Sequence, residues 1–124
     1  MPNSFWNLTE LETLRITDNN LTRIPDSIGN LQNLDELYEC NRTCAAMSHL
    51  TKGVGRRLDN TQPTAVPHAI GTLVKLRILS LGSNRLTALP ALGDLTELGA
   101  LIASSNLLNQ LPESFRHLAR LSLL

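Results

Sequence analysis

Apolar and polar residues alternate in short runs that recur along the chain. The clearest run is the stretch 76–90, LRILSLGSNRLTALP, in which leucines occupy positions 76, 79 and 81. This alternation predicts a short β-strand with one buried face. An asparagine, a leucine and a leucine-proline step follow, where the alternation stops and the chain has to turn. The stretch therefore predicts one strand followed by one turn.

The same pattern returns upstream from Leu11 and downstream from Leu98. Counted by the first leucine or its equivalent, strands are predicted to start near residues 11, 34, 53, 76, 98 and 121. Between them, segments such as 25–31 and 112–118 begin with proline and a polar or acidic residue. Proline needs no donor in a first helical turn, and acids favour its positive end. These segments therefore predict short helical or 3-10 turns.

One polar residue returns among the leucines, an asparagine at positions 19, 84 and 106. A polar side chain inside an apolar layer has to be hydrogen-bonded. Because an amide both donates and accepts, it can satisfy the backbone groups of the turn that leaves each strand. We therefore expect a ladder of buried amides with a structural role.

Self-similarity at a short fixed period indicates a stacked-repeat architecture. The pattern L-x-x-L-x-L-x-x-N-x-L, followed by L-P, resembles the leucine-rich repeat. Its period near 23 residues resembles the Ras-group and bacterial cytosolic classes of that family. The resemblance implies an α/β solenoid with a parallel sheet on its concave side and short helical or 3-10 turns on its convex side. Residues 1–124 then form a single repeat domain.

The repeat is irregular over residues 38–63. Glu39 stands where an inward aliphatic residue is expected, and Gly53 and Arg56 replace leucines. We interpret the region as two damaged repeats, with a looped-out or disordered bulge over roughly 38–62. The chain also begins and stops within a repeat, without the polar caps that cover the ends of a solenoid. We therefore expect it to be uncapped at both ends, which allows end-to-end self-association.

Composition limits which residues can form the core and which class of partner the chain can bind. The chain is 42% hydrophobic but only 3% aromatic, so leucine and isoleucine have to form the core. Its formal net charge is zero, which argues against a nucleic-acid or membrane-surface binder, because both need a basic excess. No signal peptide or apolar run of about 18 residues is present, so we expect a cytoplasmic protein.

Little in the sequence points to catalysis or to a cofactor. Cys40, Cys44, His49 and His68 form the one cluster with metal-ligand residues, but the two histidines are too far apart for a compact zinc site. The glycine-rich stretch 52–57 lacks both the third glycine of a dinucleotide loop and a G-K-[ST] step. We therefore predict no catalytic residue, no metal and no cofactor.

The resemblance implies that the chain binds another protein on its concave face. The outward-facing positions beside the strand leucines line up there, and they supply the candidate contact residues. These are Arg15, Thr17, Asp18, Tyr38, Ile78, Ser83, Ile102 and Ser105. Two alternatives stay open. The chain is the repeat portion of a larger enzyme, a kinase or a bacterial ubiquitin ligase, whose catalytic domain lies elsewhere, or it is a decayed fragment without function.

Overall fold

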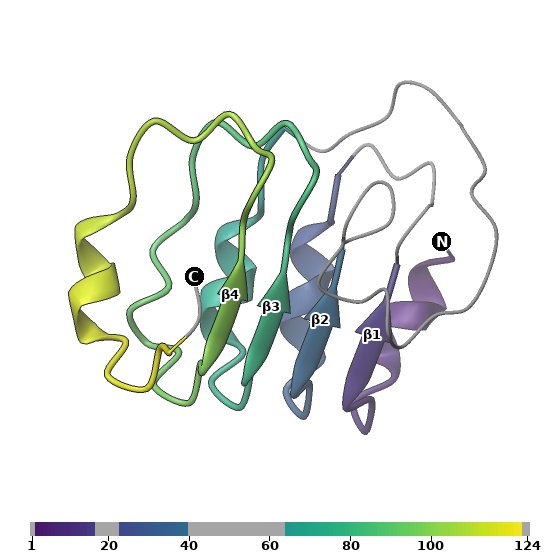
Figure 1. Cartoon of the computed structure of the whole chain (residues 1–124). Coiled ribbons are helices and arrows are strands. Elements are labelled where there is room, and N and C mark those ends of the chain that lie inside the picture. The colour runs from purple at the N-terminus through teal and green to yellow at the C-terminus, as the bar shows by residue number, and fades with distance from the viewer. Residues whose placement is uncertain (1, 17–22, 40–63, 123–124) are drawn as a thin grey trace, which may run out of the picture.

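Four short parallel strands form one sheet in the order β1-β2-β3-β4 (Figure 1). The strands are β1 (Thr13–Arg15), β2 (Glu36–Tyr38), β3 (Ile78–Ser80) and β4 (Ala100–Ile102). The computed structural model describes residues 2–16, 23–39 and 64–122. Each strand begins two residues after a start predicted from the sequence, because the leucine that opens the motif lies just before the strand.

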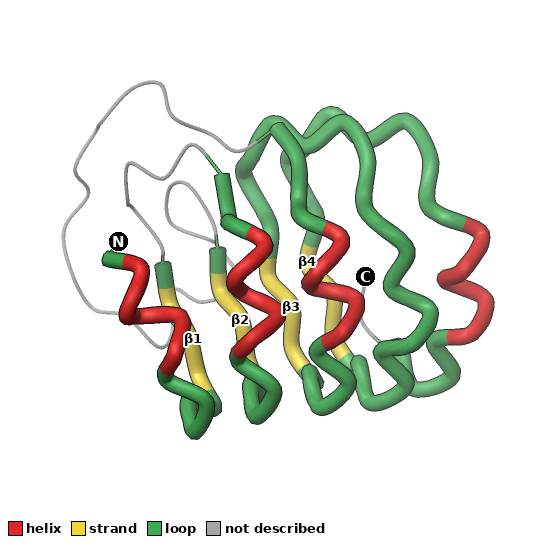
Figure 2. The backbone as a smooth tube through the Cα atoms, turned by 180° about the vertical axis from the view of Figure 1, so that it is seen from behind, coloured by secondary structure: helices red, strands yellow, loops and turns green. Residues whose placement is uncertain are grey.

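Short 3-10 helices lie on the opposite side of the molecule from the sheet (Figure 2). They are η1 (Asn3–Asn7), η2 (Asp26–Asn30), η4 (His68–Thr72) and η5 (Glu113–His117). A proline precedes each helix, and its carbonyl accepts the first N–H bond. The Pro2 carbonyl accepts from Phe5 and the Pro112 carbonyl from Phe115, both at 3.1 Å. The predicted 3-10 turns and their proline starts are therefore confirmed.

The core consists of layers of buried leucine side chains between the sheet and these 3-10 helices. The middle residues of the strands, Leu14, Leu37, Leu79 and Leu101, stand side by side in register and are buried. Each fully buried leucine contributes roughly 1.5–3 kcal/mol to the free energy of unfolding. The predicted fold class, a leucine-rich repeat solenoid with a parallel sheet and 3-10 turns, is confirmed.

The repeat that contains residues 89–98 is one residue shorter at its turn, and the structure shows how the loss is absorbed. Residues 90–94 form no 3-10 helix. Leu92, Leu95 and Leu98 nevertheless remain fully buried. The shorter surface turn is tolerated because these three leucines keep their buried positions.

The connection from β2 to β3 corrects the predicted repeat count. Successive strands begin 23, 42 and 22 residues apart, and β2 pairs directly with β3 through Glu36↔Ile78 and Tyr38↔Ser80. The sheet therefore has no place for a strand starting near residue 53 between them, as the sequence had predicted. Residue 53 and the stretch 40–63 lie outside the described residues. The looped-out bulge stays a prediction.

Candidate functional site

The outward side chains of the four strands form one continuous surface, which we call the sheet face. Each strand presents its first and third residues there, because successive side chains of a strand point to opposite sides. The sheet face comprises Thr13 and Arg15, Glu36 and Tyr38, Ile78 and Ser80, and Ala100 and Ile102. In leucine-rich repeat proteins, the corresponding face of the sheet is the concave side of the solenoid.

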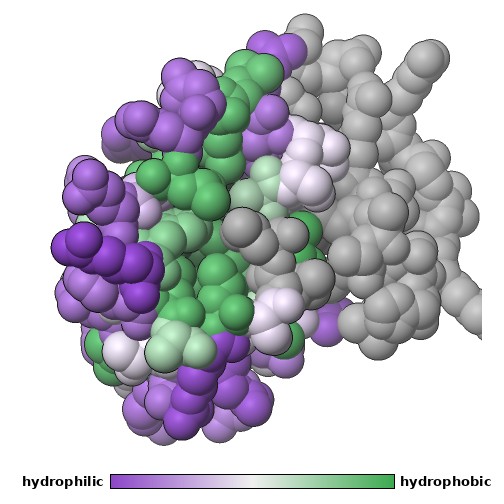
Figure 3. Space-filling model, turned by 60° about the vertical axis from the view of Figure 1, so that its left-hand side comes forward, coloured by the Kyte–Doolittle hydropathy of each residue, from purple (hydrophilic) through white to green (hydrophobic). Residues whose placement is uncertain are grey.

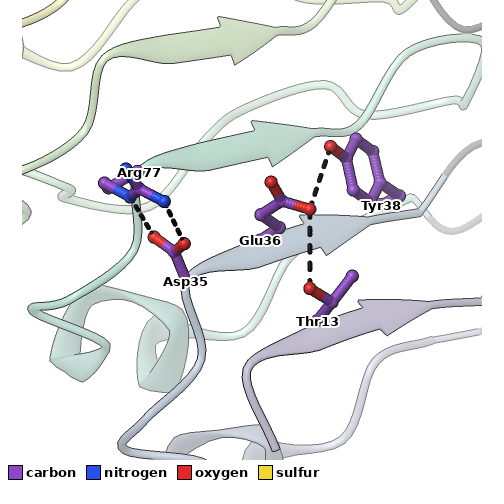
Figure 4. Close-up of polar contacts among 5 residues, drawn as sticks. All are labelled: Thr13, Asp35, Glu36, Tyr38 and Arg77. Carbon is purple, nitrogen blue, oxygen red and sulfur yellow. Dashed lines mark hydrogen bonds and ion pairs between the residues drawn. The ribbon is translucent and has the colours of Figure 1, made fainter.

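A polar cluster occupies the β1–β2 half of the sheet face. Glu36 is at its centre, since its Oε2 atom accepts hydrogen bonds from Thr13 Oγ1 at 3.5 Å and from the Tyr38 hydroxyl at 3.3 Å (Figure 4). The guanidinium carbon of Arg15 lies 5.1 Å from the centroid of the Tyr38 ring, in a cation–π contact. Burial, followed by the negative charge of Glu36, raises the pKa of the Tyr38 hydroxyl, which therefore stays protonated and donates.

An ion pair joins β2 and β3 at the edge of the sheet face. The Asp35 carboxylate accepts two hydrogen bonds from the Arg77 guanidinium, both at 2.5 Å (Figure 4). The hydrogen bond from Arg77 lowers the pKa of Asp35, so this carboxylate stays charged. The two residues are 42 positions apart in sequence. The pair therefore links the residues that precede β2 and β3 across the longest connection in the sheet.

The β3–β4 half of the sheet face exposes apolar side chains, because Ser80, its polar member, is buried. Ile78, Ala100 and Ile102 are half-buried, and Ile78 stands opposite Ala100 in register. We call these three residues the apolar patch. A surface that passes from charged and aromatic side chains to aliphatic ones can offer a partner both polar contacts and area to bury.

The structure brings together three of the eight predicted contact residues as exposed or half-exposed members of the sheet face: Arg15, Ile78 and Ile102. Tyr38 is also on this face, but only 5% of its surface is exposed, and it contacts Arg15 and Glu36. Alternation gives the direction of a side chain and not its exposure. The binding role of all eight residues stays a prediction.

Of the remaining four predicted residues, two lie in described turns and two lie outside the described residues. Ser83 and Ser105 lie in turns beyond β3 and β4, with left-handed φ angles of 58° and 57°. The Ser83 N–H donates to the Ser104 carbonyl at 2.9 Å, so its backbone connects neighbouring turns. Thr17 and Asp18 lie outside the described residues. Four members of the sheet face were not among the predicted contact residues, although the same alternation places them there: Thr13, Glu36, Ser80 and Ala100.

The predicted amide ladder is present beside the sheet. Asn106 Nδ2 donates to the carbonyls of Leu81 and Ala103 at 2.8 and 3.0 Å, and its Oδ1 accepts from Leu86 N at 2.9 Å. Asn84 Nδ2 donates to the Leu81 carbonyl at 3.0 Å. Asn19 lies outside the described residues. Asn84 and Asn106 therefore hold the turns together.

Glu39 is a buried acid that contacts this ladder. It follows β2 at the inward position that Leu81 occupies after β3, and only 5% of its surface is exposed. Asn84 Nδ2 donates to Glu39 Oε2 at 2.6 Å and to its carbonyl at 3.2 Å. Burial raises the pKa of Glu39 to about 7, although the Asn84 hydrogen bond opposes the shift. Within the described residues, the buried Asn84 Oδ1 has no hydrogen-bond partner.

The residues considered for metal binding are only partly described. His68 begins η4 on the side opposite the sheet, whereas Cys40, Cys44 and His49 lie outside the described ranges. Among described residues, no group of three or more His, Cys, Asp or Glu side chains could hold a metal ion. In the same part of the chain, no helix is long and apolar enough to cross a membrane.

A family model and one solved structure support the repeat assignment. The family model described as Leucine Rich Repeat matches residues 10–31. A solved leucine-rich repeat protein from Leptospira interrogans is 29% identical, with a TM-score of 0.60 over 98% of this chain and 32% of that chain. An internalin from Listeria monocytogenes is 20% identical, with a TM-score of 0.46 over 96% of this chain and 42% of that chain. No curated protein gives a significant sequence match.

These observations first define a class: a solenoid of stacked strand-and-turn units with one parallel sheet. More narrowly, the fold is a leucine-rich repeat solenoid, and residues 10–31 match the model of that family. It spans about a third of the length of the Leptospira protein, 32% by coverage.

Proposed function

We propose that this chain is a protein–protein interaction module that binds a partner protein on its sheet face. The observation that carries the proposal is the adjacency, on one regular sheet, of the polar cluster and the half-exposed apolar patch. Leucine-rich repeat proteins commonly serve as interaction scaffolds, and this chain matches that family.

The chemistry of the sheet face supports this function in two ways. Arginine and tyrosine are enriched among residues that dominate binding energy, and Arg15 is held over the Tyr38 ring. Preorganised side chains also lose less conformational entropy on binding. In the apolar patch, Ile78 and Ile102 are β-branched residues that suit strands in any sheet. Their partial exposure on the sheet face gives a partner apolar area to bury.

A pull-down with matched variants tests the proposal. The test variant combines Arg15→Glu with Ile102→Asp, which reverses one charge and places another in the apolar patch. The control combines Arg85→Glu with Val74→Asp, which makes the same kinds of change at exposed residues outside the sheet face. We expect a partner captured by the wild type to be retained by the control and lost by the test variant. Equal capture by all three proteins would reject the sheet face as the binding surface.

The other expectations from the sequence accompany this proposal as predictions. They are a cytoplasmic location, the absence of catalysis, metal and cofactor, and the absence of nucleic-acid and membrane partners. Fusion to a catalytic domain, as in a kinase or a ubiquitin ligase, is tested by the coding sequence on either side of these 124 residues. A cooperative melt of the purified chain would argue against a decayed fragment.

A further inference from the structure

Glu36 has a carboxylate oxygen that the fold leaves available. Its Oε2 atom accepts both hydrogen bonds of the polar cluster, from Thr13 and from Tyr38, and Figure 4 shows both reaching this one oxygen. No described residue donates to the other oxygen, Oε1. Both oxygens of a carboxylate can accept. The half-buried Glu36 therefore keeps the capacity for a charge-assisted hydrogen bond to a ligand.

The arginines near Glu36 are engaged with other groups. Arg77 donates two hydrogen bonds to Asp35, and Arg15 lies over the Tyr38 ring. Neither arginine forms a hydrogen bond or an ion pair with Glu36. Within the described part of the chain, no direct cationic partner therefore cancels the negative charge of Glu36.

A second acid without an ion pair lies beside Glu36. The Glu12 carbonyl accepts from Asp35 N and Glu36 N at 2.8 and 3.0 Å, so Glu12 is next to the start of β2. Arg77 offsets the charge of Asp35 by pairing with it, whereas neither Glu12 nor Glu36 is paired with a described cation. This part of the sheet face is therefore suited to a cationic group of a partner.

Glu36 stands next to the apolar patch in the sheet. It pairs with Ile78, and Ile78 pairs with Ala100, so the three residues form one row across β2, β3 and β4. Neighbouring strands are about 4.8 Å apart, so one strand spacing separates the charge from the first aliphatic residue. Lysine and arginine bury their methylene stems on apolar surface and keep their charged heads in polar surroundings. One such side chain can therefore lie on Ile78 and reach Glu36.

Arg15 is less suited to hold a partner that also covers the apolar patch. It belongs to β1, whereas the patch belongs to β3 and β4. The strand order β1-β2-β3-β4 places Arg15 two strand spacings, about 10 Å, from β3. Recognition of a charge next to the apolar patch therefore falls to Glu36, which selects a basic group and not an acidic one.

Another apolar area lies on the side of the molecule that carries η5. Figure 3 shows hydrophobic residues in the middle of this side and hydrophilic residues around them. Leu107 and Leu111, which precede η5 in the chain, are 63% and 44% exposed. Nothing in the structure shows what covers them. On the sheet face, by contrast, the row of Glu36, Ile78 and Ala100 defines the chemistry that a partner needs.

We propose that the partner protein places a lysine or arginine at Glu36 and, beside it, an aliphatic or aromatic side chain on the apolar patch. This partner chemistry rests on the proposed function, because the same sheet face binds it. The basic head donates to Glu36 Oε1, and its stem covers Ile78. The neighbouring apolar side chain covers Ala100 and Ile102.

A phage-displayed library of random peptides, selected on the 124-residue chain, tests this chemistry. We expect enrichment of peptides in which a lysine or arginine has an apolar neighbour within about four positions, the spacing of side chains on one face of a strand or helix. Enrichment of acidic or uncharged peptides that no longer bind the Arg15→Glu plus Ile102→Asp variant would overturn this partner chemistry and leave the proposed function standing. No enrichment at all would overturn both.

Fluorescence anisotropy with an enriched peptide then locates the charge contact. Glu36→Gln should weaken binding at least about tenfold, because the cation of the peptide loses its charged acceptor. The fold is kept, since the glutamine oxygen can still accept from Thr13 and Tyr38. Glu113→Gln is the matched control and should leave binding unchanged, because Glu113 is exposed on η5, on the opposite side from the sheet.

The peptide supplies the reciprocal change. Replacing its basic residue by glutamine should weaken binding to the wild type by a similar factor. The same replacement should cause little further loss with Glu36→Gln, because both changes remove the same contact. Losses that simply add would show that the cation binds elsewhere and would overturn the proposal.

Discussion

At the scale of single residues, Glu39 is the position where this chain departs most from its own repeat. The sequence identified Glu39 as out of pattern, because an acid stands where the other repeats place an aliphatic residue. Its partner could not be read from the sequence, since Asn84 Nδ2 reaches Glu39 Oε2 from 45 positions away. A long-range contact of this kind follows only from the register of β2 beside β3.

The raised pKa of Glu39 makes the stability of the fold depend on pH. Burial raises this pKa from 4.5 to about 7, so the folded chain binds the proton more tightly than the unfolded chain. The stabilisation is therefore fully present below about pH 4.5 and is lost as pH rises through about 7. The shift corresponds to about 3 kcal/mol in the free energy of unfolding across that window.

We predict that urea denaturation at pH 5 and pH 8 will show a less stable protein at pH 8. Glu39→Gln should remove most of the difference, because a neutral amide does not titrate and can still accept from Asn84. Glu12→Gln, at an exposed carboxyl, is the control and should leave the difference unchanged. The same pH dependence in Glu39→Gln as in the wild type would contradict the assignment of the titration to Glu39.

At the scale of the elements, local pattern predicted each described strand and 3-10 turn, but it did not predict the spacing between them. Alternation and proline starts are local signals, so β1 to β4 and the prolines before η1, η2, η4 and η5 follow from them. Which strand lies beside which is a non-local property. The spacing of predicted starts therefore suggested a strand between β2 and β3 that the pairing of these strands leaves no room for.

Gly71 shows how closely the convex turns approach one another. A Cβ atom at this position would lie 2.8 Å from the Ala91 carbonyl oxygen of the next turn, and backbone cannot move aside cheaply. We predict that Gly71→Ala lowers the free energy of unfolding by about 1–3 kcal/mol through this overpacking. Gly99→Ala is the control, because its Cβ would meet only atoms 3.9 Å away.

Denaturant titration of the two glycine variants gives the comparison. Gly71→Ala should shift the midpoint strongly and Gly99→Ala only slightly. Equal midpoints would show that the turn around Ala91 adjusts without cost, against the close approach inferred here.

At the scale of the whole molecule, the chain behaves as a one-dimensional stack in which each repeat contacts only its neighbours. The fold could therefore be assigned to a sequence with 3% aromatic residues, because its core consists of leucine layers that recur in each repeat. The direction of the sheet face also followed from the repeat. The exposures of its members did not, because alternation places Tyr38 on this face although only 5% of its surface is exposed.

The direct pairing of β2 with β3 also predicts which residues can be deleted without unfolding the sheet. β2 and β3 begin 42 residues apart, and β1 and β2 only 23, yet both pairs have the same parallel register. Removing residues 42–60 restores a spacing of 23 between β2 and β3. We predict that this variant folds with one cooperative transition. Its free energy of unfolding should lie within about 1 kcal/mol of the full chain, because loop-closure entropy changes slowly with loop length.

Thermal and urea melts followed by circular dichroism measure this outcome. A second variant that lacks residues 78–96 loses the same number of residues and serves as the control. It removes β3, so β2 and β4 lose the strand that pairs with both, and the cooperative transition should disappear. If the variant lacking 42–60 also failed to melt cooperatively, the direct pairing of β2 with β3 would not be enough to hold the two halves of the stack together.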